Sequence, residues 1–262
     1  MNARGSNCPP WIVLGAGTAT PHCDRSPSGH LFWAPEGPVL VDMGPGTLWR
    51  LAAQGVHLRD LAAIFLSHRH LDHCLDMPAL LFGSRIPGHG RTLPLPVYMG
   101  PGMDDHMDRL SQALGHWFEP RGFEVDWRVL DPGPDGMNIS LGGASARIAA
   151  VVHDETSVAL RVQSAGVEVV YSGDSDDCPA LTGLCYGADV AVLECSTAVD
   201  NKVPGHLTAR EVARIACQAQ VGGVVLVHMY PELDGVDLAA QIAAYGYRGW
   251  VVPACDGYVV EV

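Results

Sequence analysis

The chain has 262 residues, of which 48% are hydrophobic and 17% are charged, a balance typical of globular proteins. Its formal net charge is −13, and Lys202 is the single lysine among its 16 basic residues. Because nucleic-acid binding relies on neutralising phosphates, this acidity disfavours a broad face for nucleic acid.

The N-terminal residues lack the apolar stretch and cleavage site of a secretory signal. No apolar run approaches the roughly 20 residues that cross a bilayer. The eight cysteines are scattered without a CxxC pair, which favours reduced thiols over a disulfide framework. We therefore expect a cytoplasmic protein without membrane contact. Since the sequence contains neither a linker nor a repeat, we also expect one domain over residues 1–262.

Short apolar strands alternate with helical segments along the whole chain. In the first half the pattern predicts strands at 10–21 (ending in a glycine-rich turn), 29–35, 37–44, 61–67 and 95–100, and helices at 46–55, 76–83 and 102–118. In the second half it predicts strands at 123–130, 145–153, 157–166, 167–174, 188–196, 222–230 and 250–254, and helices at 208–220 and 235–246. This alternation predicts an α/β sandwich with the sheets inside and the helices outside.

The string HRHLDH, residues 68–73, places three histidines and an aspartate directly behind an apolar strand. In extended backbone His68 and His70 point the same way and can reach one ion, while Asp72 and His73 can reach a second. This set suits zinc, manganese or iron.

Three further candidate ligands stand at strand ends, where the loops of α/β folds converge. His153 and His228 can complete the ligand sets of the two ions, and Asp174 offers a carboxylate that can bridge the two ions. We therefore expect seven protein ligands for two metal ions. We interpret the remaining histidines outside the "GHLTA" segment as structural: His22, His30, His57, His89, His106 and His116.

The string SHRHLDH resembles the signature of the metallo-β-lactamase-fold hydrolases. The segments VLVDMGPGT, VVYSGDS, ADVAVLECS, GHLTAREVA and VVLVHMYP follow the order of the ribonuclease Z-like branch, so the resemblance covers nearly the whole chain. It implies a four-layer αββα sandwich with a dinuclear site, usually of two Zn²⁺ ions, although Mn²⁺ or Fe²⁺ are alternatives. Its implied ligands are His68, His70 and His153 for one ion, Asp72, His73 and His228 for the other, and Asp174 as the bridge.

The same resemblance implies that His206 donates a proton and that Glu194 supports it. The chain reads HLT where the branch has HST, and ECS where the branch has HEAT. The implied reaction is hydrolysis by a metal-bridging hydroxide, with Asp72 orienting the nucleophile and His206 protonating the leaving alkoxide.

The choice of substrate rests on what the chain lacks. Ribonuclease Z enzymes that process tRNA carry a long arm between the third histidine motif and the bridging aspartate, whereas His153 and Asp174 are only 21 residues apart. We therefore predict a phosphodiesterase for small or activated diesters that binds a small anionic ester and forms a homodimer. The alternatives are an arylsulfatase, a lactonase, a β-lactamase, a tRNA 3′-processing endonuclease, or a non-enzymatic binding module. Intact ligand residues disfavour the last of these.

Overall fold

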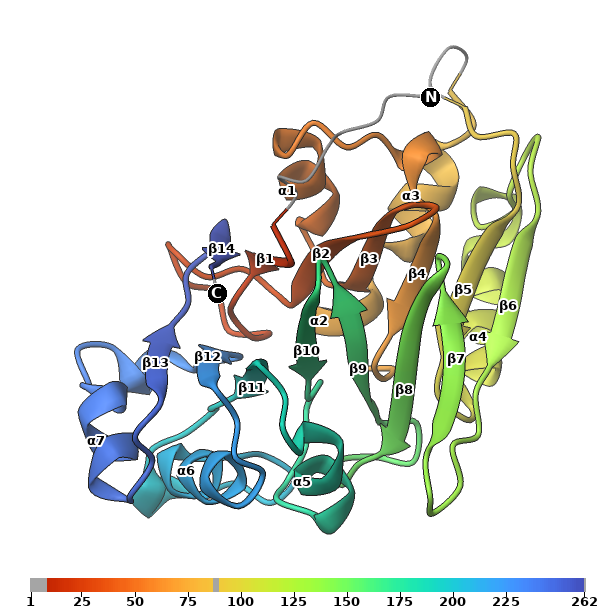
Figure 1. Cartoon of the computed structure of the whole chain (residues 1–262). Coiled ribbons are helices and arrows are strands. Elements are labelled where there is room, and N and C mark those ends of the chain that lie inside the picture. The colour runs from red at the N-terminus through yellow and green to blue at the C-terminus, as the bar shows by residue number, and fades with distance from the viewer. Residues whose placement is uncertain (1–8, 87–89, 262) are drawn as a thin grey trace.

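A computed structural model describes residues 9–86 and 90–261, which form two mixed sheets of seven strands each (Figure 1). The first sheet holds, in spatial order, β14 (Tyr258–Val260), β1 (Trp11–Gly15), β2 (Gly29–Ala34), β3 (Gly37–Met43), β4 (Ala63–Leu66), β5 (Leu95–Met99) and β6 (Val125–Val129). The second holds β13 (Trp250–Pro253), β12 (Gly223–Val227), β11 (Val190–Glu194), β10 (Val167–Tyr171), β9 (Val158–Ser164), β8 (Ala144–Ala150) and β7 (Met137–Leu141).

Helices cover the outer face of each sheet (Figure 1). The first sheet is covered by α1 (Thr47–Ala53), α2 (Leu71–Cys74), α3 (Met77–Gly83) and α4 (Met103–Leu114). The second is covered by α5 (Pro179–Cys185), α6 (Ala209–Gln218) and α7 (Leu238–Ala244). Short 3₁₀ turns, η1 (Leu58–Asp60), η2 (Gly115–Trp117), η3 (Val199–Asn201) and η4 (Pro231–Leu233), lie in the connections. The predicted αββα sandwich is confirmed.

Strand β4 shows why the apolar runs form a buried middle layer. Its alternate residues Ala63 and Phe65 pack between the sheets, whereas Ile64 and Leu66 pack under the helices. Because successive side chains of a strand point to opposite faces, a strand covered on both faces must be apolar throughout. All four residues are fully buried.

The connections position the site. Strands β3 to β6 run parallel to one another, as do β10 to β13, so the loops after them leave at their carboxyl ends. β9 and β10 form an antiparallel hairpin whose turn, Ala165 and Gly166, has positive φ at both residues. This hairpin accounts for the short interval between His153 and Asp174.

β7, α5 and β14 are among the elements that were not predicted from the sequence. β7 lies at the edge of its sheet with mostly exposed side chains, so its apolar pattern is weak. α5 begins at Pro179 in a glycine-containing segment with no long apolar period. β14 has three residues and pairs with β1, so only a long-range contact defines it. Among the described residues, no helix is long and apolar enough to span a membrane.

Candidate metal centre

The seven predicted ligand residues meet at one edge of the sandwich. They fall into two groups, and in each group the ligand atoms lie within 4.8 Å of one another. The groups are His68, His70, His153 and Asp174, and Asp72, His73 and His228. This division matches the two predicted shells, while the binding of metal by these residues remains a prediction.

Asp174 lies between the two groups. Its Oδ2 atom is 3.6 Å from His68 Nε2 and 3.7 Å from His153 Nε2 on one side, and 3.3 Å from His228 Nε2 on the other. Its Oδ1 atom is 3.3 Å from His73 Nε2. The carboxylate therefore lies within reach of the histidines of both groups.

The ligand residues lie in the segments after β4, β8, β10 and β12, and at His228 the backbone is left-handed. His228 follows β12 with φ of 53°, and its N–H donates to the carbonyl of Ala16 at 2.8 Å. The glycine-rich turn after β1 thus supports this histidine. A Cβ at Gly44 would stand 2.0 Å from the Asp72 carbonyl oxygen, so glycine is required where the two loops touch.

Asp42 orients His73 directly and His68 through Ser67, a role that was not predicted from the sequence. Its Oδ2 atom lies 2.7 Å from His73 Nδ1 and accepts the hydroxyl protons of Ser67 at 2.8 Å and Tyr171 at 2.6 Å. Ser67 Oγ is in turn 3.0 Å from His68 Nδ1. Asp42 directly ends an apolar run, as the predicted ligands do, and that was the available signal.

The inner atoms fit a bound cation. His68 Nε2, His73 Nε2 and Asp174 Oδ1 are buried and make no hydrogen bond of good geometry, although His73 Nε2 and Asp174 Oδ1 lie 3.3 Å apart. Such atoms are costly to bury unless something pairs with them, and imidazole nitrogen with carboxylate oxygen is a zinc-type donor set. The structure therefore fits divalent metal at this cluster.

The charges within the cluster favour a cation as well. Burial lowers the pKa of His73, but the Asp174 and Asp42 carboxylates outweigh it and hold that pKa well above its usual value. Burial raises the pKa of Asp174, but His228 and His73 outweigh it and hold that pKa well below its usual value. The buried carboxylates thus attract positive charge, which a metal ion would supply in place of protons.

His206 stands beside the cluster with its outer nitrogen engaged. Its Nδ1 atom lies 3.1 Å from Oε1 of the fully buried Glu194, and its ligand atom lies near those of Asp174 and His228. Glu194 also accepts the Ser196 hydroxyl at 2.6 Å, and that hydroxyl lies 3.0 Å from His228 Nδ1. Ser196, which was not predicted to act, therefore links the two histidines.

The remaining groups of donor residues give weaker support for a metal site. His22, Cys23 and Asp24 form a third three-donor group, but His22 Nδ1 accepts from the Asp24 N–H at 3.1 Å and its Nε2 lies 3.0 Å from Asp234. His89 and Cys8 lie outside the described residues, and the seven described cysteines are free.

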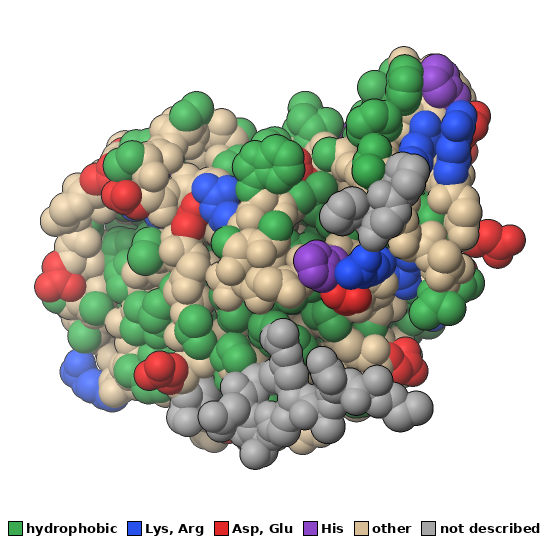
Figure 2. All heavy atoms as spheres, turned by 90° about the horizontal axis from the view of Figure 1, so that it is seen from above, with side chains coloured by type: hydrophobic (Ala, Val, Ile, Leu, Met, Phe, Trp, Pro, Cys, Tyr) green, Lys and Arg blue, Asp and Glu red, His purple; other side chains and the backbone are tan. Residues whose placement is uncertain are grey.

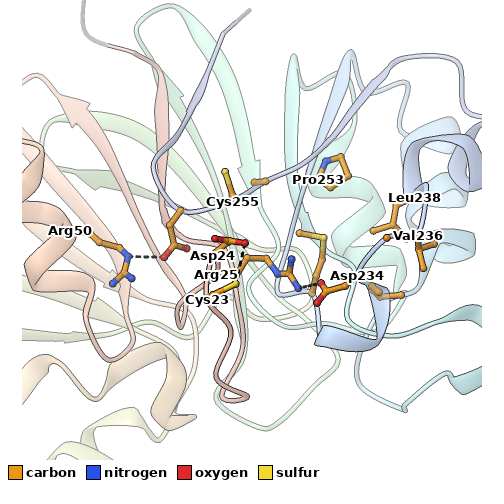
Figure 3. A pocket seen from close by; sticks show the side chains of 14 residues that line it. Cys23, Asp24, Arg25, Arg50, Asp234, Val236, Leu238, Pro253 and Cys255 are labelled. Atoms are coloured by element: carbon orange, nitrogen blue, oxygen red, sulfur yellow. Dashed lines mark hydrogen bonds and ion pairs between the residues drawn. The ribbon is translucent and has the colours of Figure 1, made fainter.

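A cavity of about 700 Å³ is lined by Cys23, Asp24 and the ion pairs Arg25–Asp234 and Arg50–Asp256 (Figure 3). Met229, the residue after His228, contributes to its wall, but none of the seven cluster residues does. The cavity is therefore separate from the metal centre.

The αββα sandwich and the His/Asp cluster at its edge define a hydrolase of the metallo-β-lactamase fold. A family model described as a beta-lactamase superfamily domain matches residues 38–229. The chain belongs to this superfamily.

Two mycobacterial relatives cover most of the chain. The uncharacterised protein ML1173 of Mycobacterium leprae is 34% identical, over 88% of this chain and 81% of the relative. A ribonuclease Z of Mycobacterium bovis is 29% identical, over 95% of this chain and 97% of the relative.

Solved structures agree with this placement. The metallo-β-lactamase fold protein YhfI from Bacillus subtilis superposes with a TM-score of 0.82 at 25% identity, covering 96% of this chain and 98% of that one. The short form of human tRNase Z has a TM-score of 0.74 at 21% identity and covers 96% and 98%. A diphosphatase of the PhnP family has a TM-score of 0.70 at 19% identity and covers 96% and 97%. The last two share the fold.

Proposed function

We propose that the protein is a dinuclear metal-dependent phosphodiesterase that cleaves small or activated phosphate diesters. The observation that carries the proposal is the position of Asp174, within 3.7 Å of histidine nitrogens from both ligand groups. When bound there, two divalent ions, most simply Zn²⁺, would supply an activated water and neutralise the charge of the substrate oxygens.

The side chains divide the remaining work. His206 donates Nδ1–H to Glu194, which leaves Nε2 to hold the proton for the departing alkoxide. Glu194 fixes this ring orientation in the imidazolium form, which carries a proton on each ring nitrogen, because its own oxygens also accept from the backbone N–H groups of Ser175 at 2.7 Å and Leu207 at 3.0 Å. Asp72, the partly exposed carboxylate of the cluster, orients the nucleophile.

Several features support a small substrate. Only the β9–β10 hairpin and short loops lie between His153 and Asp174, so an arm for tRNA has no place there. The face in Figure 2, on which the histidines of the cluster do not gather, carries Lys and Arg side chains in small groups beside acidic and apolar ones, so this face has no continuous basic band. The net charge of −13 also opposes extended contact with phosphates.

A second candidate is tRNA 3′ processing, favoured by the relatives that carry the name ribonuclease Z. Side-by-side assays with zinc-loaded protein on bis(p-nitrophenyl) phosphate, an aryl sulfate, a lactone and a tRNA precursor separate the candidates. We expect diester hydrolysis to dominate and Asp174→Asn to abolish it. Preferred cleavage of the tRNA precursor, the sulfate or the lactone would replace the proposed substrate class.

A further inference from the structure

Asp176 joins three loops that carry site residues. It follows Asp174 by two positions, and its backbone N–H donates to the Val152 carbonyl at 2.6 Å, next to His153. Its carboxylate contacts the loop over residues 202–206, which ends at His206. The three loops follow β10, β8 and β11.

The carboxylate and the single lysine form a clamp on the His206 loop. Asp176 Oδ1 accepts from Lys202 Nζ at 2.6 Å, and Oδ2 accepts from the Gly205 N–H at 3.0 Å. Lys202 Nζ also donates to the carbonyl of His206. The clamp therefore holds peptide groups on both sides of His206.

The clamped loop also reaches the metal cluster. The carbonyl of Gly205 lies 2.9 Å from His153 Nδ1 and accepts its proton when the other ring nitrogen is the ligand. Gly205 has φ of 89°, and a Cβ there would stand 3.0 Å from that nitrogen. One loop thus sets the orientation of both His153 and His206.

We propose that the Asp176–Lys202 pair is a positioning device for His206 and His153. The proposal rests on the proposed function, because the position of His206 matters most when it delivers a proton. Both side chains are partly exposed, at 24% for Asp176 and 31% for Lys202, so the pair contributes little to global stability. Its effect is on geometry, where a displacement of about 1 Å can cost about 100-fold in rate.

The catalytic test compares Lys202→Met with Lys202→Arg in the zinc-loaded full chain. We expect Lys202→Met to lower kcat for dialkyl diesters, which have a poor alkoxide leaving group, by roughly tenfold or more. It should change kcat much less for nitrophenolate leaving groups, and Lys202→Arg should restore most of the loss. In a His206→Ala background the same substitution should have a much smaller further effect, due only to the displacement of His153. Equal losses on both leaving groups, or full additivity with His206→Ala, would overturn the proposal.

A second measurement does not need activity. Amide hydrogen exchange across residues 203–207 should become faster in Lys202→Met and in Asp176→Asn, with or without zinc. Arg128→Met, which removes the exposed Arg128–Asp126 pair on β6, is the matched control and should leave these amides unchanged. Unchanged exchange in the clamp variants refutes the device even when the diesterase assay succeeds. Faster exchange in a protein that cleaves no diester supports the clamp and refutes the proposed function.

Discussion

The Nδ1 atom of His206 lies 3.1 Å from Oε1 of Glu194, and the Glu194 side chain is fully buried. Two backbone amides and the Ser196 hydroxyl hold the same carboxylate. The pair is therefore arranged so that only the other nitrogen of His206 can exchange a proton with a substrate.

His206→Ala should keep its metal and lose turnover selectively. A poor leaving group needs the proton and nitrophenolate does not, so we expect a loss of roughly 100-fold or more on alkyl esters and a much smaller loss on bis(p-nitrophenyl) phosphate. Parallel kinetics with metal analysis check this. Equal losses on both substrates would argue against proton donation.

Glu194→Gln should change the pH profile. Burial lowers the pKa of His206, but the Glu194 hydrogen bond and charge outweigh it and leave that pKa above its ordinary value. A general acid works when protonated, so its contribution is present below its pKa and is lost as pH rises through it. Removing the Glu194 charge lowers the pKa, so the descending limb of kcat should move to lower pH. A limb that stays in place would show that another group titrates.

Metal should stabilise the fold. The buried atoms His68 Nε2, His73 Nε2 and Asp174 Oδ1 make no hydrogen bond of good geometry, and a ligand at 100 times its Kd adds about 2.7 kcal/mol. For a chain of this size we expect zinc to raise the Tm by roughly 5–10 °C. Scanning fluorimetry with and without chelator tests this, and His68→Ala should show a much smaller rise. An identical Tm in both conditions would contradict a buried metal centre.

Asp42→Asn should weaken metal binding, although Asp42 is not one of the seven predicted ligands. Asparagine tolerates the left-handed backbone at this position, where φ is 53°, so the substitution removes mainly the charge that orients His73. We expect metal affinity to fall roughly 10–100-fold in a chelator competition assay. Tyr171→Phe removes one donor to Asp42 and should cause a smaller loss.

Thr208→Ala should affect stability rather than chemistry. Thr208 caps α6. Its hydroxyl oxygen accepts from the Arg210 N–H at 3.3 Å, and the backbone N–H of Thr208 donates to the Glu211 carboxylate at 3.0 Å. We expect a loss of about 1 kcal/mol in denaturant unfolding, which Thr208→Ser should largely avoid. A loss of activity with unchanged stability would show that the cap instead positions His206.

The strong periodic elements could be predicted because each is defined by its own residues. The helix at 208–220 carries a capping residue and an apolar face, and it forms as α6 over Ala209–Gln218. β14 could not be predicted, since three residues form a strand only because β1 offers an unpaired edge. Edge strand β7 could not be predicted because most of its side chains are exposed. Helix α5 could not be predicted because its buried residues, Leu181, Leu184 and Cys185, span little more than one helical turn.

The candidate site could be predicted from the sequence for a similar reason. His68, Asp174 and His228 each end an apolar run, so their meeting at a common edge followed from the sheet. The residues behind them were harder to foresee. Ser196 and Lys202 act through contacts with loops distant in sequence, and nothing in their immediate neighbourhood signals this. Arg69, within the HRHLDH string, likewise pairs with Asp154 at 3.2 Å in the loop after His153.

Asp256, just before β14, accepts the backbone N–H of Ala16 at 3.0 Å and that of Ser26 at 3.0 Å. Ala16 in turn holds the backbone of His228. During synthesis the loop over residues 16–26 therefore lacks its anchor until the ribosome has released residue 256. The nascent chain keeps the β1 edge open until then, which exposes it to pairing with other chains. The contacts that hold the backbone of His228 through Ala16 are therefore complete only after residue 256 has been synthesised.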